Sequence, residues 1–148
     1  MVILCVIMIS ASGCGDMNAS YDDNAAIARS GDSYSSKNAS SIQIGGNLTV
    51  SATLTGTKTI WRYETKNETD VTLSYLLFVT NGGKAKLVLI TPDDEVIILS
   101  ESTDNTGNSE MQSQTVSLKP GNNRIKIVGY DAPKFNLELQ ISVGQMDW

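Results

Sequence analysis

Few side chains in this chain of 148 residues are of the types that carry out covalent or proton-transfer chemistry. Histidine is absent, which removes the commonest general base and any serine–histidine or cysteine–histidine pair. The two cysteines are Cys5 and Cys14, so the chain after residue 14 offers neither a thiolate nucleophile nor a disulfide. We therefore expect a protein that is not an enzyme and that carries no cofactor.

The densest group of carboxylates is Asp93, Asp94 and Glu95. Paired carboxylates can hydrolyse glycosidic bonds when a cleft holds them at a fixed separation. This group directly follows Pro92, however, and the run PDDE is typical of a tight turn at the surface. We interpret it as a solubilising turn rather than a catalytic pair.

Oxygen-bearing side chains also gather in the polar segment ESTDNTGNSE, where they could serve as calcium ligands. The candidates are Asp104, Asn105, Asn108 and Glu110. Their spacing does not match the EF-hand loop. A solvated loop is the favoured interpretation, and calcium remains a weak alternative.

Trp61 and Tyr63 are two residues apart in the run TIWRYE, so a strand would place both rings on one face. If that face is exposed, the pair could stack on sugar rings as a carbohydrate-binding platform. If it is buried, the pair fills the core. Burial is favoured because Arg62 and Glu64 occupy the opposite face.

A second pair of apolar residues, Leu76 and Phe78, shares a face with Thr72 and Ser74 in the run DVTLSYLLFVT. The pair either marks a partly exposed patch or belongs to the core or an edge, and the second interpretation is favoured.

The remaining candidate is Cys14, which follows the apolar run VILCVIMI and the small residues Ser10 to Gly13. Eight apolar residues are too few to span a bilayer but fit the core of a secretory signal. Ala11-Ser12-Gly13 before Cys14 resembles the lipobox of bacterial lipoproteins. The resemblance implies a signal peptide over residues 1–13, acylation of Cys14 and a place on the outer side of a bacterial cell membrane. An ordinary secretory signal and a buried strand are the alternatives.

Residues 14–40 are dominated by Ser, Asn, Asp, Ala and Gly. Such a composition buries too little apolar area to offset the entropy of ordering. We therefore expect a flexible tether spanning roughly 30 Å between the lipid on Cys14 and a folded domain. A short helix at DDNAAIARS is the alternative.

From residue 41 to residue 148 the pattern alternates with a period of two, which is typical of half-buried strands. In the last strand, Phe135, Leu137, Leu139 and Ile141 are expected to face inward. Residues 86–91 and 96–100 flank PDDE as a hairpin. About eight short strands predict an all-β domain, a single jelly-roll-like β-sandwich of antiparallel strands.

The segments KTIWRYE, LVLITPDDEVIIL and SLKPGNNRIKIVGYDAPKFNLELQIS are similar to strands and turns of pre-peptidase C-terminal domains. This resemblance covers residues 56–143 and implies a jelly-roll sandwich with an accessory role.

The net charge of −5 is unclustered, which argues against a nucleic-acid partner because phosphate binding needs a basic surface. We expect a membrane-anchored lipoprotein with a non-catalytic binding or structural module. Its partners would be the membrane, through Cys14, and a glycan or another envelope protein. The alternative is a carbohydrate-binding module that uses Trp61 and Tyr63.

Overall fold

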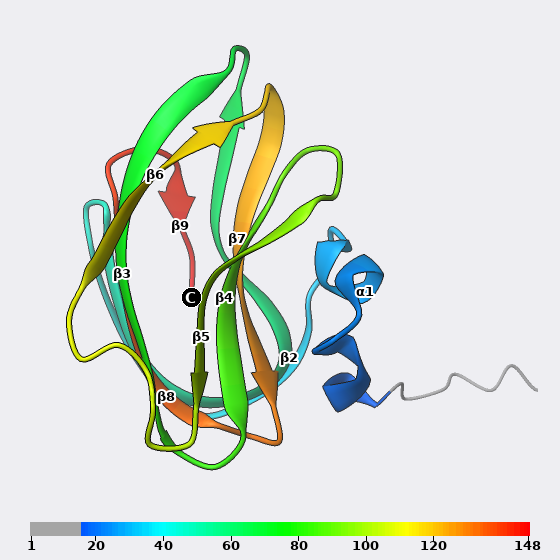
Figure 1. The fold of residues 1–148 in the computed structure, drawn as a ribbon, viewed down its shortest axis with the longest axis vertical. Helices are drawn as coiled ribbons and strands as arrows, with labels where there is room; N and C mark the ends of the chain where they lie inside the picture. The colour runs from blue at the N-terminus through cyan, green and yellow to red at the C-terminus, as the bar shows by residue number, and fades with distance from the viewer. Residues whose placement is uncertain (1–15) are drawn as a thin grey trace, which may run out of the picture.

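The computed structural model describes residues 16–148, which form a β-sandwich of antiparallel strands (Figure 1). Two short helices, η1 (Met17–Ser20) and α1 (Asn24–Ala28), precede the strands. The strands are β1 (Ser33–Ile44), β2 (Asn47–Thr65), β3 (Thr69–Asn81), β4 (Lys84–Ile90), β5 (Val96–Thr103), β6 (Gln112–Leu118), β7 (Gly121–Tyr130), β8 (Lys134–Ile141) and β9 (Gln145–Met146).

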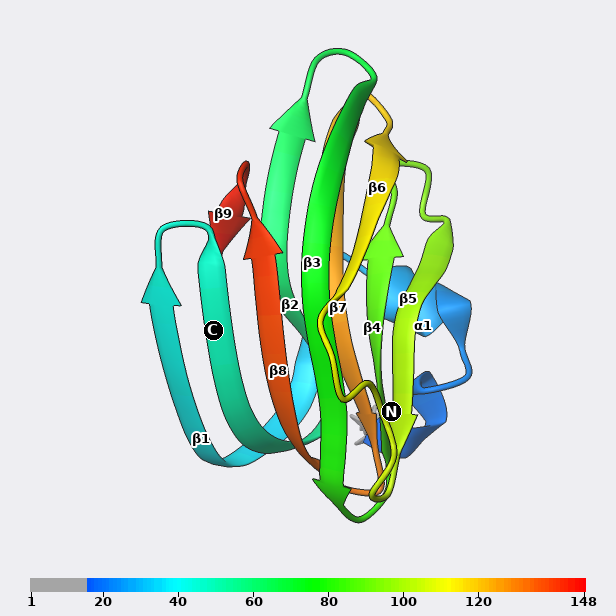
Figure 2. The same cartoon turned by 60° about the vertical axis from the view of Figure 1, so that its left-hand side comes forward.

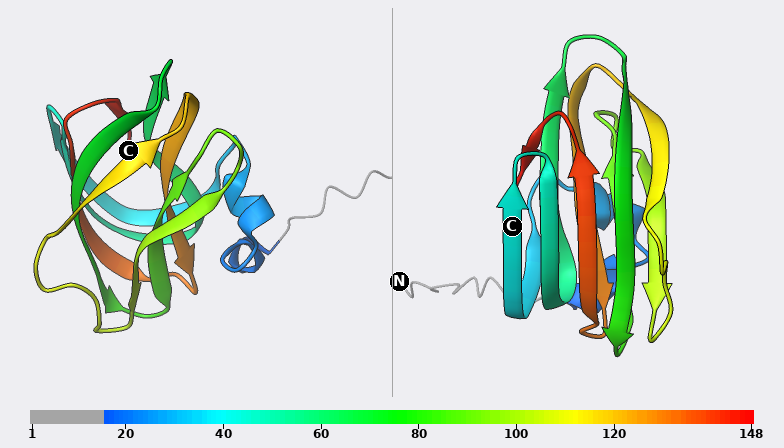
Figure 3. Two further views of the ribbon diagram at one scale, coloured as in Figure 1. Left: turned by 45° about the horizontal axis from the view of Figure 1, so that its top comes forward. Right: turned by 90° about the vertical axis from the view of Figure 1, so that its left-hand side faces the viewer.

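The sheet order is β5-β4-β7-β2-β8-β3-β6, and β1 and β9 also pair with β2. β2 is shared by both layers, because its residues 47–53 pair with β8 and its residues 56–65 pair with β7. The change of partner falls at Gly56, whose φ of +95° favours glycine. One layer therefore holds β1, the first half of β2, β8, β3 and β6, and the other holds β5, β4, β7 and the second half of β2 (Figures 2 and 3).

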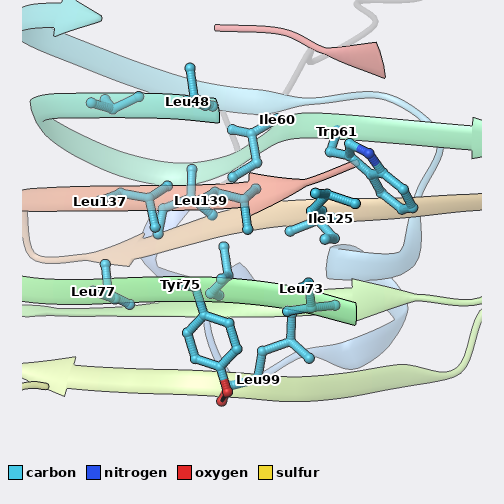
Figure 4. Close-up of a cluster of buried hydrophobic side chains, with 14 of the residues drawn as sticks. Leu48, Ile60, Trp61, Leu73, Tyr75, Leu77, Leu99, Ile125, Leu137 and Leu139 are labelled. Atoms are coloured by element: carbon cyan, nitrogen blue, oxygen red, sulfur yellow. Dashed lines mark hydrogen bonds between the residues drawn. The ribbon is translucent and has the colours of Figure 1, made fainter. Parts of the chain in front are cut away.

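The core lies between these layers and is built by strict alternation along the strands (Figure 4). In β8 the predicted inward residues Phe135, Leu137, Leu139 and Ile141 are buried, and the residues between them are exposed. Tyr75 also enters the core, where its hydroxyl donates to the carbonyl oxygen of Leu99 at 2.8 Å. The predicted jelly-roll-like all-β fold and the hairpin on either side of PDDE are confirmed.

The segment predicted as a tether is instead folded from residue 17 onward. Asp16 and Asp23 cap η1 and α1 by accepting backbone hydrogen bonds from the first turn of each helix. β1 then pairs with β2 along most of its length. The prediction of a flexible tether is therefore wrong for residues 17–40, and the folded domain begins well before residue 41.

Two large apolar side chains, Tyr21 and Ile27, attach this N-terminal segment to the outer face of β4 and β7. Both are fully buried, and they pack with Val88, Ile90 and Val128 of those strands. The composition predicted disorder because this segment has few apolar residues. It folds because the sheet already presents an apolar surface that needs a cover.

Two cations of β7 hold the end of α1 in place. Lys126 is fully buried and donates to the carbonyl oxygens of Arg29 at 2.7 Å and Gly31 at 2.9 Å. Arg124 donates to the carbonyl oxygens of Ala28 at 2.8 Å and Arg29 at 3.0 Å. These bonds satisfy carbonyl groups that a helix leaves free at its C-terminal end.

Candidate functional site

Trp61 lies in the core rather than on a binding face. Its side chain is 1% exposed, and its indole nitrogen donates to the carbonyl oxygen of Val143 at 2.8 Å. The ring of the half-buried Tyr63 packs against it, with 6.0 Å between centroids (Figure 4 shows Trp61 within the core cluster). Because Trp61 has no ring face free for a sugar, the alternative of a platform made by Trp61 and Tyr63 is excluded, and the favoured interpretation of burial is correct for Trp61.

Within the described residues, the oxygen-bearing loop between β5 and β6 does not bring three carboxylates together. Asp104 accepts a hydrogen bond from the backbone of Gly82 at 3.0 Å, so it supports the β3–β4 turn. The loop also carries Asn105 in a left-handed conformation, Asn108 and Glu110. Across residues 16–148, no group of three or more Asp, Glu, Cys or His side chains is placed to hold a metal ion.

The carboxylates of the PDDE turn are held in ion pairs. Lys119 lies 2.8 Å from Asp93 and 3.1 Å from Glu95, and Arg124 lies 3.2 Å from Asp94. Hydrogen bonds from Lys119 and Thr91 lower the pKa of Asp93 to about 2. An acid this strong is a poor proton donor near neutral pH, and it sits on an exposed turn.

A hollow of about 380 Å³ lies on the outer face of the layer that contains β8 and β3, and it extends over β2, β8 and β3. Strand register places its side chains in two rows. Ser51, Asn136 and Phe78 are aligned in one row, and Thr49, Glu138 and Leu76 are aligned in the next. Leu76 and Phe78 are half-buried, so the interpretation of a partly exposed patch is the correct one for this pair.

The β5–β6 loop forms one wall of this hollow, through Asn108 and Ser109. The backbone of Asn108 donates to the carbonyl oxygen of Leu77 at 3.4 Å, and Gly107 forms a bridge with Phe78. Gly107 has a φ of +140°, and a Cβ there would lie 2.6 Å from the Leu77 carbonyl oxygen. Only glycine lets the loop come this close to β3.

The hollow combines a small apolar patch with hydrogen-bonding groups and one carboxylate. An aromatic ring and a leucine supply apolar surface, while two amides and several hydroxyls supply donors and acceptors. Of the described lining residues, Glu138 alone carries a charge. Convergent polar groups around an apolar patch are typical of small-molecule sites.

A larger hollow of about 640 Å³ lies between η1, α1 and the start of β1. Its wall includes Asp16, the first residue that the structure describes, and it contains three aspartates but no aromatic ring. We therefore place the candidate site at Phe78, where the described lining combines an aromatic ring and a leucine with amide and hydroxyl groups.

The predicted signal peptide over residues 1–13 and the predicted lipidation site Cys14 lie outside the described residues. Within residues 16–148, no helix is long and apolar enough to cross a membrane.

No family model matches the chain, and no curated protein matches it. Among solved structures, a family 29 carbohydrate-binding module complexed with mannohexaose aligns at 11% identity, over 76% of this chain and 82% of its own, with a TM-score of 0.39. A carbohydrate-binding module from Cellvibrio mixtus lichenase 5A, in complex with cellotriose, aligns at 17% identity over 80% and 89% of the two chains, with a TM-score of 0.35.

An exo-β-1,3-galactanase from Phanerochaete chrysosporium, with β-1,3-galactotriose, aligns at 12% identity and a TM-score of 0.39. The alignment spans 74% of this chain but 27% of the galactanase. At these TM-scores and sequence identities, the alignments give no information about which ligand this chain binds.

Proposed function

We propose that this protein is a non-catalytic glycan-binding module whose site is the hollow around Phe78, and that it is held at a membrane by a lipid on Cys14. The observation that carries the first part is the placement of Phe78 and Leu76. These two half-buried apolar side chains line the hollow beside exposed amide and carboxylate groups.

Each part of the hollow has a role in this proposal. The C–H face of a sugar ring packs on the ring of Phe78 and on Leu76. The amides of Asn136 and Asn108 both donate to and accept from sugar hydroxyls, and the carboxylate of Glu138 accepts from them. The paired rows across β8 and β3 fix the position of these groups, because strand register sets which side chains are neighbours.

Glu138 also supports a binding role rather than a hydrolytic one. Glycoside hydrolysis commonly uses two carboxylates on either side of the scissile bond. The described lining supplies one carboxylate. We therefore expect a bound oligosaccharide to be recovered intact after long incubation with the protein.

The anchoring part of the proposal rests on the lipobox-like run before Cys14. Because η1 begins at Met17, only Gly15 and Asp16 separate its first residue from Cys14. The domain would then sit close to the membrane surface rather than at the end of a long tether. Two acyl chains are enough for durable attachment. Replacing Cys14 with alanine should move the protein from the membrane fraction to the soluble fraction, and unchanged fractionation would refute the lipid anchor.

The glycan-binding part is tested by screening the full chain, purified in detergent, on an array of neutral and acidic oligosaccharides. Phe78→Ala should abolish binding to the glycans that the wild type captures. Phe78→Leu retains apolar volume without the ring and should retain only part of the affinity. Tyr63→Phe, outside the hollow, is the control for an aromatic residue. Binding that survives Phe78→Ala in a folded protein would place the site elsewhere.

A further inference from the structure

A second hollow, of about 370 Å³, lies on the same face of the same three strands. Its lining includes Asn47 of β2, Gln140 of β8 and Ser74 of β3. Strand register aligns these three residues in one row. This row comes directly after the row of Thr49, Glu138 and Leu76, which belongs to the first hollow.

Three of the four outward side chains of β8 line the two hollows, and the fourth, Lys134, is not among the described lining residues. Asn136 and Glu138 line the first, Gln140 lines the second, and all three are exposed. They alternate with the buried core residues, so they point to one side at intervals of roughly 7 Å. From Asn136 to Gln140 the strip measures about 14 Å, which is longer than a single sugar ring.

Charge along the strip is low. Among residues 16–148, neither lining contains a lysine or an arginine, and Glu138 is the one carboxylate. The groups at the two ends are amides, which donate and accept equally well. A ligand that fits this strip is uncharged, hydroxyl-rich and extended along one direction.

We infer that the two hollows form one binding strip along β8, and that its ligand is a linear neutral polysaccharide rather than a single sugar or an acidic glycan. One sugar unit packs at Phe78, and units further along the same chain contact Gln140, Asn47 and Ser74. This inference rests on the proposed glycan-binding function and adds a second subsite to it.

Titration calorimetry of the full chain in detergent tests the inference, with cello-oligosaccharides and manno-oligosaccharides from the disaccharide to the hexasaccharide. Affinity for one of the two series should rise by about three- to tenfold between the disaccharide and the tetrasaccharide. This increase is what one or two additional hydrogen bonds to the longer ligand would contribute. Gln140→Ala should remove this gain without changing the affinity for the disaccharide. Phe78→Ala should abolish measurable binding at every length.

The control is Gln43→Ala, because Gln43 is an exposed glutamine of β1 that lines neither hollow. It should bind every length as the wild type does. A second variant of the same subsite, Asn47→Ala, should reproduce the effect of Gln140→Ala. Melting temperatures of all variants show whether they are folded.

Three results would overturn the inference in different ways. If a glycan binds through Phe78 but affinity does not depend on chain length, and Gln140→Ala has no effect, the second subsite is refuted while glycan binding stands. If neither series binds and the array shows no glycan, both the strip and the proposed function fail. A preference for acidic oligosaccharides would refute the assignment of a neutral ligand.

Discussion

The ammonium group of Lys126 lies 3.3 Å from the carboxylate of Asp32, and this ion pair joins β7 to the segment that precedes β1. Lys126 is fully buried, whereas the side chain of Asp32 is partly exposed. Together with the bonds from Lys126 to the carbonyl oxygens of Arg29 and Gly31, the pair fixes the N-terminal segment on the sandwich.

Replacing Lys126 with methionine should destabilise the fold strongly. The variant keeps apolar volume but removes one donor each from the carbonyl oxygens of Arg29 and Gly31, and it removes the cation that pairs with Asp32. Breaking a buried pair from one side costs about 3–5 kcal/mol, which should appear as a lower midpoint in urea denaturation. Lys37→Met, at an exposed position of β1, serves as the control and should change the midpoint little. Equal midpoints for both variants would contradict the role given to Lys126.

Asp32 should make stability depend on pH in the acid range. Burial alone would raise its pKa, but hydrogen bonds from Thr59 and the charge of Lys126 outweigh burial, so the pKa of Asp32 is lowered from 3.8. A carboxyl group whose pKa is lower in the folded state adds stability above its unfolded pKa and loses it as the pH falls through the folded value.

Thermal melts between about pH 5 and pH 2 should therefore show a loss of stability in the wild type. Asp32→Asn should be less stable at pH 5 and should lose less on acidification. A variant whose melting temperature falls in parallel with that of the wild type would assign the acid sensitivity to other groups.

The N-terminal segment should contribute to stability through Ile27. Replacing Ile27 with alanine removes a fully buried side chain that packs on Val88, Ile90 and Val128. Large-to-small substitutions of this kind cost about 2–5 kcal/mol. Ala25→Ser, at an exposed position of α1, is the control. If residues 17–32 behaved as a loose tether in solution, Ile27→Ala would leave the denaturation midpoint unchanged.

Gly107 should affect binding through the position of the β5–β6 loop. A Cβ at residue 107 would lie 2.6 Å from the carbonyl oxygen of Leu77, and the φ of +140° strains any other residue. Gly107→Ala should displace Asn108 from the hollow, weaken glycan binding by roughly tenfold and cost about 1–3 kcal/mol of stability. Both effects are measured on one sample by calorimetry and thermal melting.

Gly31→Ala is the matched control for that experiment, because a Cβ at Gly31 would meet nothing within 4 Å. Its affinity and stability should stay near those of the wild type. Wild-type affinity in Gly107→Ala would show that the loop is not part of the site.

Features that depend on neighbouring residues alone could be predicted from the sequence. The alternation from Phe135 to Ile141 assigned the buried face of β8, and the PDDE turn placed the hairpin of β4 and β5. Both are set locally, by the two-residue period of a strand and by the preference of proline and aspartate for turns. The absence of histidine, and of cysteine after residue 14, likewise limits chemistry whatever the fold.

Tertiary structure decided the rest, because the partners are distant along the chain. The segment at residues 17–32 is ordered by Arg124 and Lys126, which lie more than 90 residues later. The same strand periodicity allowed Trp61 to be exposed or buried, and only the packing of the second layer placed its ring inside. The binding strip arises from β2, β8 and β3 in register, so no single segment contains the pattern that would reveal it.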